Sequence, residues 1–128
     1  MRVLVVDDDA VSRTVLEDTL SRYGKVSACA DGSEAVGAAR LALDRGEPYH
    51  LICMDISMPV MNGLDALQLL REYEAQAANN ARAKVIVITG TEDSVTINEA
   101  FSRLCDAYIV KPIDTEELLG IVGVLLSD

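Results

Sequence analysis

The sequence predicts an α/β fold in which a five-stranded, mostly parallel sheet carries helices on both faces. Two observations predict it. Five short runs rich in β-branched residues alternate along the chain with longer segments whose apolar residues recur three and four positions apart. Most of the short runs are apolar throughout, which is typical of strands that are buried on both faces. Because strict alternation of strand and helix favours right-handed crossover connections, we expect a doubly wound sheet.

The predicted elements follow one another in the order that this fold requires. The strands are expected at residues 3–6, 25–29, 51–54, 84–88 and 107–110. The fifth helix begins with a capping-box signature, in which Asp114 precedes Glu117 by three residues. The apolar positions that define the four earlier helices are Val11, Val15, Leu16, Leu20 and Tyr23, then Val36, Ala39 and Leu43, then Leu64, Leu67, Leu70 and Tyr73, and finally Ile97, Phe101 and Leu104.

Length and composition exclude several classes of protein. The 128 residues have room for one domain, which we expect to cover residues 1–128. Eleven basic against 21 acidic residues give a net charge of −10 at pH 7, which opposes direct binding of nucleic acid. Three cysteines without a CxxC pair favour buried thiols in a reducing cytoplasm. No signal peptide is recognisable, and the longest apolar stretch is about half of what a membrane span needs. We therefore expect a cytoplasmic domain that binds neither nucleic acid nor membrane.

Polar residues follow four of the predicted strands. Asp7 and Asp8 come after the first strand, Asp55 after the third, Thr89 after the fourth and Lys111 after the fifth. Open parallel sheets bind ligands outside the carboxyl ends of their strands, so we expect these side chains to meet. Clustered carboxylates raise one another's pKa, and a divalent cation such as Mg²⁺ relieves that repulsion. The sequence therefore predicts a Mg²⁺ site, although aspartates in this place also cap helices.

The segments around these residues resemble the signature motifs of response-regulator receiver domains. Residues 54–63, with the sequence MDISMPVMNG, resemble the loop that carries the phosphoacceptor in that family. The segments VVDD at 5–8, TG at 89–90 and YIVKP at 108–112 match the other signature positions in order. The resemblance extends from residue 2 to about residue 126. It implies a flavodoxin-like (βα)5 sandwich that acts in two-component signalling.

The resemblance implies how the acidic residues are used. Asp55 is expected to accept a phosphoryl group from a histidine kinase, a phosphotransfer protein or a small phosphodonor. Asp8, Asp55 and the backbone carbonyl of Ser57 are expected to bind Mg²⁺, while Asp7 acts through bound water. Phosphoryl transfer depends mainly on positioning and charge neutralisation, which this set of residues supplies.

The resemblance also assigns residues that respond to the phosphoryl group. Lys111 would hold one phosphoryl oxygen as a point charge, and Thr89 would donate a hydrogen bond to another. Tyr108, three residues before Lys111, has the place of the switch aromatic residue, and the bond from Lys111 to Pro112 is expected to be cis. Such a chain is not an enzyme towards other substrates, because it catalyses only its own phosphorylation and dephosphorylation. No motif identifies the cognate kinase or the downstream effector.

Two other functions stay open. One is a receiver-like interaction module that works without phosphorylation. The other is a haloacid-dehalogenase-like phosphatase, because residues 3–11 fit an apolar strand followed by DxDxV, with Asp7 as nucleophile and Asp9 as general acid. That second reading leaves the loop at 55–63 unexplained and lacks an acidic pair at a strand end after Lys111. Asp9 is equally suited to cap the first helix.

The C-terminal segment is more apolar than a helix with one buried face requires. Residues 118–126 are apolar around most of the expected helix. This predicts either a surface for a partner or for self-association, or a helix that is covered on all sides. We expect a monomer or a weak dimer. The start at Met1 and the polar end at residues 127–128 favour a stand-alone domain over the front of a longer protein.

Overall fold

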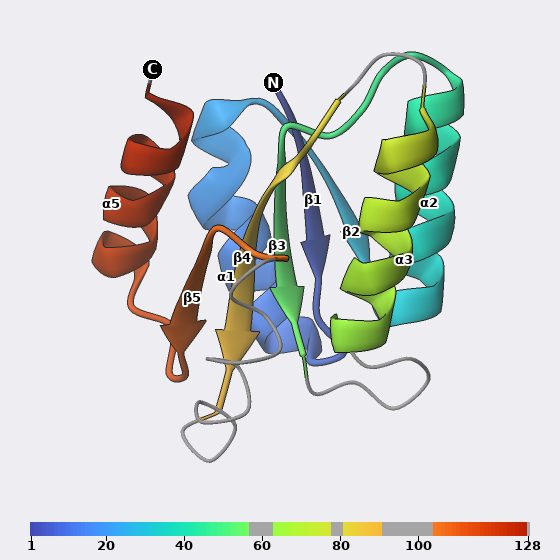
Figure 1. Ribbon diagram of the computed structural model, residues 1–128. Coiled ribbons are helices and arrows are strands. Elements are labelled where there is room, and N and C mark those ends of the chain that lie inside the picture. The colour runs from blue at the N-terminus through green and yellow to red at the C-terminus, as the bar shows by residue number, and fades with distance from the viewer. Residues whose placement is uncertain (57–62, 78–80, 91–103, 128) are drawn as a thin grey trace.

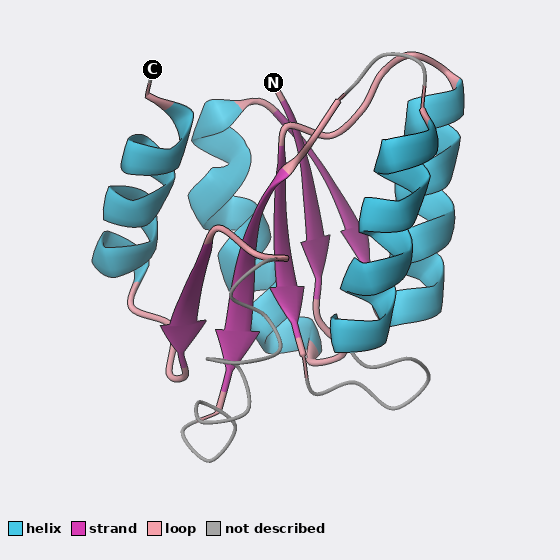
Figure 2. Ribbon diagram, in the orientation of Figure 1, coloured by secondary structure: helices cyan, strands magenta, loops and turns pink. Residues whose placement is uncertain are grey.

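Five parallel strands form one sheet in the order β2-β1-β3-β4-β5 (Figures 1 and 2). The computed structural model describes the chain except for residues 57–62, 78–80, 91–103 and 128. The strands are β1 (Arg2–Val6), β2 (Lys25–Cys29), β3 (Leu51–Asp55), β4 (Lys84–Thr89) and β5 (Ala107–Val110). The helices among the described residues are α1 (Ala10–Leu20), the short 3-10 helix η1 (Ser21–Tyr23), α2 (Gly32–Asp44), α3 (Gly63–Gln76) and α5 (Thr115–Leu126). The predicted α/β class and doubly wound parallel arrangement are confirmed.

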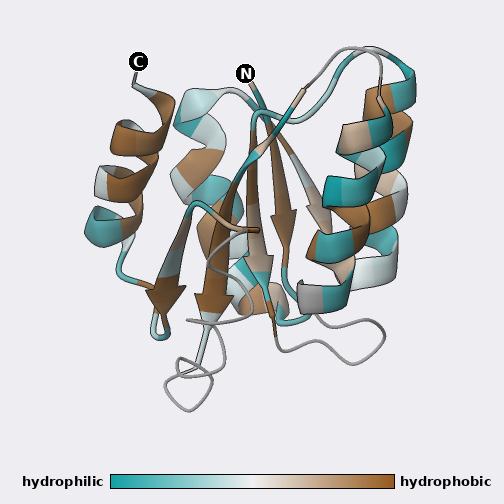
Figure 3. Ribbon diagram, in the orientation of Figure 1, coloured by the Kyte–Doolittle hydropathy of each residue, from teal (hydrophilic) through white to brown (hydrophobic). Residues whose placement is uncertain are grey.

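The helices form one layer on each face of the sheet, with α1 and α5 on one side and α2 and α3 on the other (Figure 1). Alternate residues of the central strands point into the two layers. Leu4 and Val6 join the core under α2 and α3, whereas Val3 and Val5 join the core under α1 and α5. Both cores draw on the apolar strands, which Figure 3 shows in brown at the middle of the sheet. Burial on both faces is therefore the reason why these strands are continuously apolar.

Aspartate side chains cap three of the helices. Asp9 accepts hydrogen bonds from the backbone N–H of Val11 at 3.2 Å and from the hydroxyl of Ser12 at 2.9 Å. Asp114 accepts from the first-turn N–H groups of α5, and Asp31 does the same for α2. These groups have no partner within the helix itself, so each cap stabilises the start of its helix. The capping roles predicted for Asp9 and Asp114 are confirmed.

The apolar positions of the first predicted helix differ in burial, and most of those of the fourth are not described. In α1, Leu16 and Leu20 are buried, whereas Val11 and Val15 of the same helical pattern are exposed. Tyr23 lies in η1 and packs partly against the core. For the fourth predicted helix, Ile97 and Phe101 lie outside the described residues.

Helix α5 is not covered on all sides. Leu118 and Val122 are buried against the sheet, whereas Val124 is 73% exposed. The alternative of a fully covered terminal helix is therefore excluded. Among the residues that the structure describes, no helix has the length and apolar character that a membrane crossing needs.

Candidate functional site

The carboxyl ends of β1 and β3 bring three aspartates together. Asp7 directly follows β1, and Asp55 is the last residue of the neighbouring strand β3. Both side chains are buried, with 0% and 1% of the residue exposed, whereas Asp8 is exposed. One carboxylate oxygen from each of the three residues lies within 4.8 Å of the others. We call Asp7, Asp8 and Asp55 the acidic cluster.

Lys111 supplies the positive charge next to the acidic cluster. It follows β5, and its Nζ donates a hydrogen bond to Oδ2 of Asp55 at 2.9 Å. Partial burial lowers the pKa of Lys111, but the hydrogen bond to Asp55 and the charges of the nearby aspartates outweigh this and raise it. Lys111 is therefore charged at neutral pH. The pair lies at the border of the core, because the Asp55 side chain is 2% exposed and that of Lys111 is 33% exposed.

The carboxylate of Asp7 is only half satisfied. Its Oδ1 accepts a hydrogen bond from the backbone N–H of Asp9 at 2.9 Å, whereas its Oδ2 is buried without a hydrogen-bond partner in the described part of the chain. Burial, with smaller contributions from the charges of Asp55 and Asp8, raises the pKa of Asp7 to about 6 despite the Asp9 hydrogen bond and Lys111. A buried carboxylate oxygen of this kind needs a proton, a water molecule or a cation.

The acidic cluster fits a hard divalent cation. Three carboxylates against one lysine leave an excess of negative charge, and carboxylate oxygens are the ligands that Mg²⁺ accepts. Mg²⁺ usually keeps several waters, one of which would supply the partner that Asp7 Oδ2 lacks. Ser57, whose carbonyl was expected to complete the set, lies outside the described residues.

Thr89 is the last residue of β4, the strand that pairs with β3, and Tyr108 is the second residue of β5, which pairs with β4. Thr89 is fully buried, and its hydroxyl donates a hydrogen bond to the carbonyl of Gly90 at 2.9 Å. Tyr108 pairs with Val87 of β4 in the sheet register and is 43% exposed. The Lys111–Pro112 peptide bond is cis, as the resemblance implied. In this structure the Thr89 hydroxyl is thus bound to the backbone of the next residue, and Tyr108 has surface left to bury.

Two residues near the site make contacts that the sequence did not predict. Arg13 reaches back from α1, and its Nη1 donates to the backbone carbonyl of Asp7 at 2.8 Å, which holds the turn that carries the acidic cluster. Gly63 starts α3 directly against β3, because a Cβ there would lie 2.7 Å from Cα of Ile56 and 2.9 Å from the carbonyl oxygen of Asp55. Gly63 is the last residue of the 54–63 segment, but its role in this close approach depends on tertiary packing.

These features define an α/β domain with a buried carboxylate–lysine pair at the carboxyl edge of its sheet. The family model of the response regulator receiver domain matches residues 3–123, and the chain belongs to this family. It is therefore a phosphoacceptor domain of two-component signalling, in which receiver domains work with histidine kinases and phosphotransfer proteins.

Individual relatives agree with this assignment. The chain is 28% identical to the probable chemotaxis protein CheY of Rhizobium etli, over 92% of the chain and 86% of that protein. It is 29% identical to hybrid signal transduction histidine kinase G of Dictyostelium discoideum, over 96% of the chain but 3% of that much longer protein. The solved structure of response regulator TrrA from Thermotoga maritima with Mg²⁺ and a beryllium fluoride group is 29% identical, with a TM-score of 0.74 and 98% of both chains covered.

Proposed function

We propose that Asp55 is the residue that accepts the phosphoryl group, in a reaction that requires Mg²⁺. The observation that carries this proposal is the hydrogen bond from Lys111 Nζ to Asp55 Oδ2 at 2.9 Å. This contact places a positive charge against the Asp55 carboxylate, where phosphoryl oxygens would arrive. Asp7 is less suited, because its raised pKa of about 6 keeps part of it protonated at neutral pH.

The transfer step replaces a P–N bond of the donor with a P–O bond to Asp55. An oxygen of Asp55 attacks the phosphorus of a phosphohistidine whose second ring nitrogen carries a proton, the P–N bond breaks, and the ring leaves as neutral imidazole with the electron pair. The product is an acyl phosphate on Asp55, and Lys111 stays protonated beside it. Asp8 and Asp55 would hold Mg²⁺ with the carbonyl of Ser57, and Asp7 would hold a water bound to it. When bound, Mg²⁺ neutralises negative charge on the phosphoryl group.

We also propose that Thr89 and Tyr108 convert phosphorylation into a change of surface. The phosphoryl group adds a charge of about −1.5 to −2 together with strong acceptor oxygens. The Thr89 hydroxyl, which donates to Gly90 in this structure, would turn towards one of these oxygens. The exposed ring of Tyr108 would then move inwards, which changes the face around β5.

We also infer the extent of the domain and the compartment in which it works. All described elements share one sheet and its two layers, which supports a single receiver domain over residues 1–128. The three cysteines are free, which supports a reducing compartment such as the cytoplasm. A histidine kinase or phosphotransfer protein would be the phosphodonor there, and the chain would catalyse only its own phosphorylation and dephosphorylation.

The test is phosphorylation by acetyl phosphate with Mg²⁺, read as the intact mass of the protein. The wild type is expected to gain one phosphoryl group, and Asp55→Asn is expected to gain none while it keeps its circular dichroism spectrum. Asp9→Asn is the matched control, because it changes an aspartate of the same edge that caps α1 and lies outside the acidic cluster.

Other outcomes would overturn the proposal in defined ways. A phosphoryl group mapped to Asp7, or turnover of phosphate esters, would favour the phosphatase alternative. A wild type that stays unlabelled by acetyl phosphate and by a phosphorylated phosphotransfer protein would favour an interaction module that works without phosphorylation.

A further inference from the structure

The turn between β1 and α1 is fixed on both sides of Asp8. Before Asp8, the backbone N–H of Asp7 donates to the carbonyl of Cys29 at 3.1 Å. After it, the backbone N–H of Asp9 donates to Oδ1 of Asp7 at 2.9 Å. Asp8 itself is exposed, and its carboxylate has no hydrogen bond or ion pair among the described residues. The position of Asp8 therefore depends on how its two neighbours are held.

Arg13 holds this turn at two points. Its backbone N–H donates to the carbonyl of Asp9 at 2.9 Å, which is the first hydrogen bond of α1. Its Nη1 donates to the carbonyl of Asp7 at 2.8 Å. Side chains on a helix lean towards the N-terminus, so Arg13 reaches the residues in front of its own helix. One residue thus binds the carbonyls on both sides of Asp8.

The carbonyl that the Arg13 side chain binds belongs to the peptide bond between Asp7 and Asp8. A peptide bond is planar, so the carbonyl oxygen of Asp7 and Cα of Asp8 lie in one rigid plane. The hydrogen bond at one end of this plane holds Cα of Asp8 at the other end, and the anchored N–H of Asp9 restricts the backbone beyond it. Arg13 therefore acts on the place of Asp8 without touching its carboxylate.

The energetics of α1 alone do not explain an arginine at this position. Arg13 lies three residues after Ala10, the first residue of α1, and the N-terminal end of a helix disfavours positive charge. Arg13 also has no ion pair among the described residues that would offset this cost. The favourable contact that remains is the hydrogen bond to the Asp7 carbonyl.

We propose that Arg13 is a positioning residue for the metal, because it holds Asp8 in the place from which the Asp8 carboxylate binds Mg²⁺. This inference rests on the proposed Mg²⁺ site at the acidic cluster. A ligand that is already in place loses less freedom when the ion arrives, so the affinity is higher. Lys111 binds a carboxylate oxygen of Asp55, whereas Arg13 binds a carbonyl and leaves the carboxylates free for the cation.

The sign of the effect separates positioning from charge. Removing a positive charge near three carboxylates would by itself make the site more negative and strengthen Mg²⁺ binding. Removing an anchor of the turn has the opposite effect. Arg13→Met keeps an apolar stem but has no donor, and we expect it to weaken Mg²⁺ binding about tenfold, the lower end of the range for residues that orient metal ligands.

An NMR titration of the unphosphorylated protein with MgCl₂ measures this affinity. Ser12→Ala is the matched control, because it removes a hydrogen bond to Asp9 in the same turn but keeps the contact between Arg13 and Asp7. It is expected to leave the affinity unchanged. In the metal-free protein, the backbone order parameters of Asp8 and Asp9 should fall in Arg13→Met from the rigid range, about 0.85, towards the flexible range, below about 0.6.

Phosphorylation by acetyl phosphate gives a second readout. Because the change acts on metal binding, Arg13→Met is expected to need about tenfold more Mg²⁺ for half of its maximal rate. At saturating Mg²⁺ it should reach the wild-type rate. A general disturbance of the fold would instead lower the rate at every concentration of Mg²⁺, and circular dichroism shows whether the fold is kept.

Three results would contradict the proposal, and they differ in what they overturn. Unchanged or tighter Mg²⁺ binding in Arg13→Met, with weakened binding in Asp8→Ala, overturns the positioning role alone. If Ser12→Ala weakens binding as much as Arg13→Met does, the start of α1 as a whole is responsible rather than Arg13. If Asp8→Ala binds Mg²⁺ like the wild type, the proposed metal site itself is wrong, and the role of Arg13 is wrong with it.

Discussion

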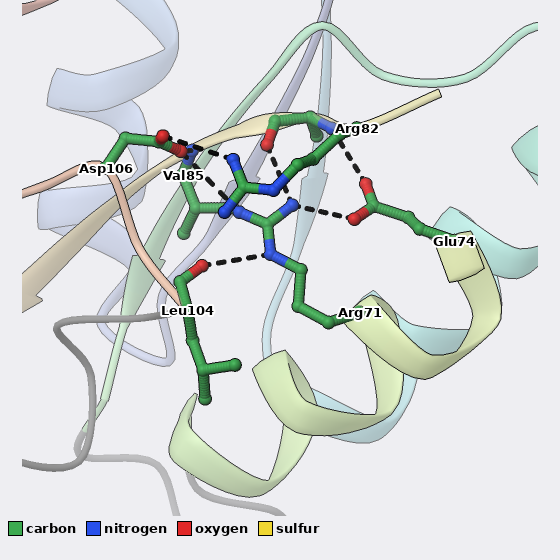
Figure 4. Close-up of polar contacts among 7 residues, drawn as sticks. Arg71, Glu74, Arg82, Val85, Leu104 and Asp106 are labelled. Carbon is green, nitrogen blue, oxygen red and sulfur yellow. Dashed lines mark hydrogen bonds and ion pairs between the residues drawn. The ribbon is translucent and has the colours of Figure 1, made fainter. Parts of the chain in front are cut away.

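Two polar clusters lie at opposite ends of the sheet and differ in their charge balance. The acidic cluster with Lys111 lies at the carboxyl edge and combines three carboxylates with one ammonium group. The other, which we call the arginine cluster, lies where β4 and β5 begin (Figure 4). It combines two guanidinium groups with two carboxylates, those of Arg71, Glu74, Arg82 and Asp106. One cluster is thus unbalanced and the other is neutral.

The arginine cluster uses its polar atoms to connect three elements (Figure 4). Arg71 of α3 donates from Nε to the carbonyl of Leu104 at 2.9 Å and from Nη1 to Glu74 at 2.7 Å and to the carbonyl of Ala83 at 2.9 Å. The second oxygen of Glu74 accepts from the backbone N–H of Ala83 at 2.7 Å. In the same way, Asp106 accepts from the backbone N–H of Val85 at 2.8 Å.

Charge balance distinguishes the structural arginine cluster from the reactive acidic cluster. In the arginine cluster, both carboxylates bind guanidinium and backbone groups, so the burial of these carboxylates is compensated within the protein. Nη2 of Arg71 makes no hydrogen bond in the described residues, but it lies 3.5 Å from Oδ2 of Asp106 as an ion pair. In the acidic cluster, Asp7 keeps a buried oxygen without a partner in the described residues, and negative charge is left over. Protein groups stabilise the first cluster, whereas the second is complementary to a cation and a phosphoryl group.

The largest expected effect on stability comes from breaking the arginine cluster. Arg71→Met should lower the free energy of unfolding by about 3–5 kcal/mol, because it leaves buried Glu74 without its counter-ion. Urea unfolding measures this loss. Arg45→Met, at the exposed end of α2, is the control and should stay within about 0.5 kcal/mol of the wild type.

A double variant tests whether charge balance is the cause. Arg71→Met combined with Glu74→Met removes both charges and should be more stable than Arg71→Met alone. If the double variant is the less stable of the two, the packing of the arginine stem matters more than its charge.

The acidic cluster should respond in the opposite way, with a large effect on binding and a small one on folding. Asp8→Ala is expected to lower the affinity for Mg²⁺ at least tenfold, which corresponds to about 1.4 kcal/mol or more. Because Asp8 is exposed, the free energy of unfolding without metal should change by less than about 0.5 kcal/mol. An NMR titration with Mg²⁺ measures the affinity, and Asp9→Asn should leave it unchanged. Equal affinity in Asp8→Ala would remove Asp8 from the metal site.

Hydropathy alternation predicted the fold and the edge of the sheet at which the site lies, because both follow from the order of strands and helices. The strand boundaries were less accurate. The third strand was expected to end at residue 54 and the fourth at 88, yet Asp55 and Thr89 are the last residues of β3 and β4. Polar side chains suggested the start of a loop, whereas sheet pairing of Asp55 with Ile88 and of Thr89 with Val110 extends the strands. Hydrogen bonding to a neighbouring strand decides where a strand ends, and the sequence of one segment does not show that pairing.

The contacts that connect distant elements could not be predicted from the sequence. Arg13 and Arg71 look like ordinary helix residues, because the reach of a guanidinium group depends on how two elements pack. Glu74 gives no sequence signal for burial, although it is 8% exposed in the structure. The acidic cluster could be predicted from the sequence, because its residues lie at the carboxyl ends of strands in a parallel sheet. Their meeting therefore depends on topology alone.

Asp7 should make the metal-free protein sensitive to pH. Folding raises the pKa of Asp7 from its ordinary value of 3.8 to about 6, so the folded state binds this proton more tightly. The stability that the proton supplies is complete below the lower value and is lost as the pH rises through about 6. Asp7→Asn should therefore be more stable than the wild type at pH 7, by about 1–3 kcal/mol without metal.

The measurement is thermal or urea unfolding of both proteins in chelator between pH 4.5 and 7.5, values that bracket the pKa of about 6. The difference between the two proteins should shrink towards low pH, and saturating Mg²⁺ should favour the wild type instead. A pH-independent difference would mean that Asp7→Asn acts through packing.

Thr89 is expected to contribute only part of the switch. A hydrogen bond from its hydroxyl to a phosphoryl oxygen supplies about 1.5–3 kcal/mol. Moving a conformational equilibrium from 1:99 to 99:1 requires about 5.5 kcal/mol, so Thr89 alone does not complete the switch. Lys111, the metal and the burial of Tyr108 must supply the rest, and we expect the active form to be visible before phosphorylation. In NMR spectra, signals of residues 104–110 should move along one line between the free and the beryllofluoride-bound states, and Thr89→Ala should shorten this movement without abolishing it. Unchanged movement in Thr89→Ala would assign the switch to Lys111 and the metal. Complete loss of movement would mean that the Thr89 hydroxyl, which donates to Gly90 in this structure, controls the equilibrium by itself.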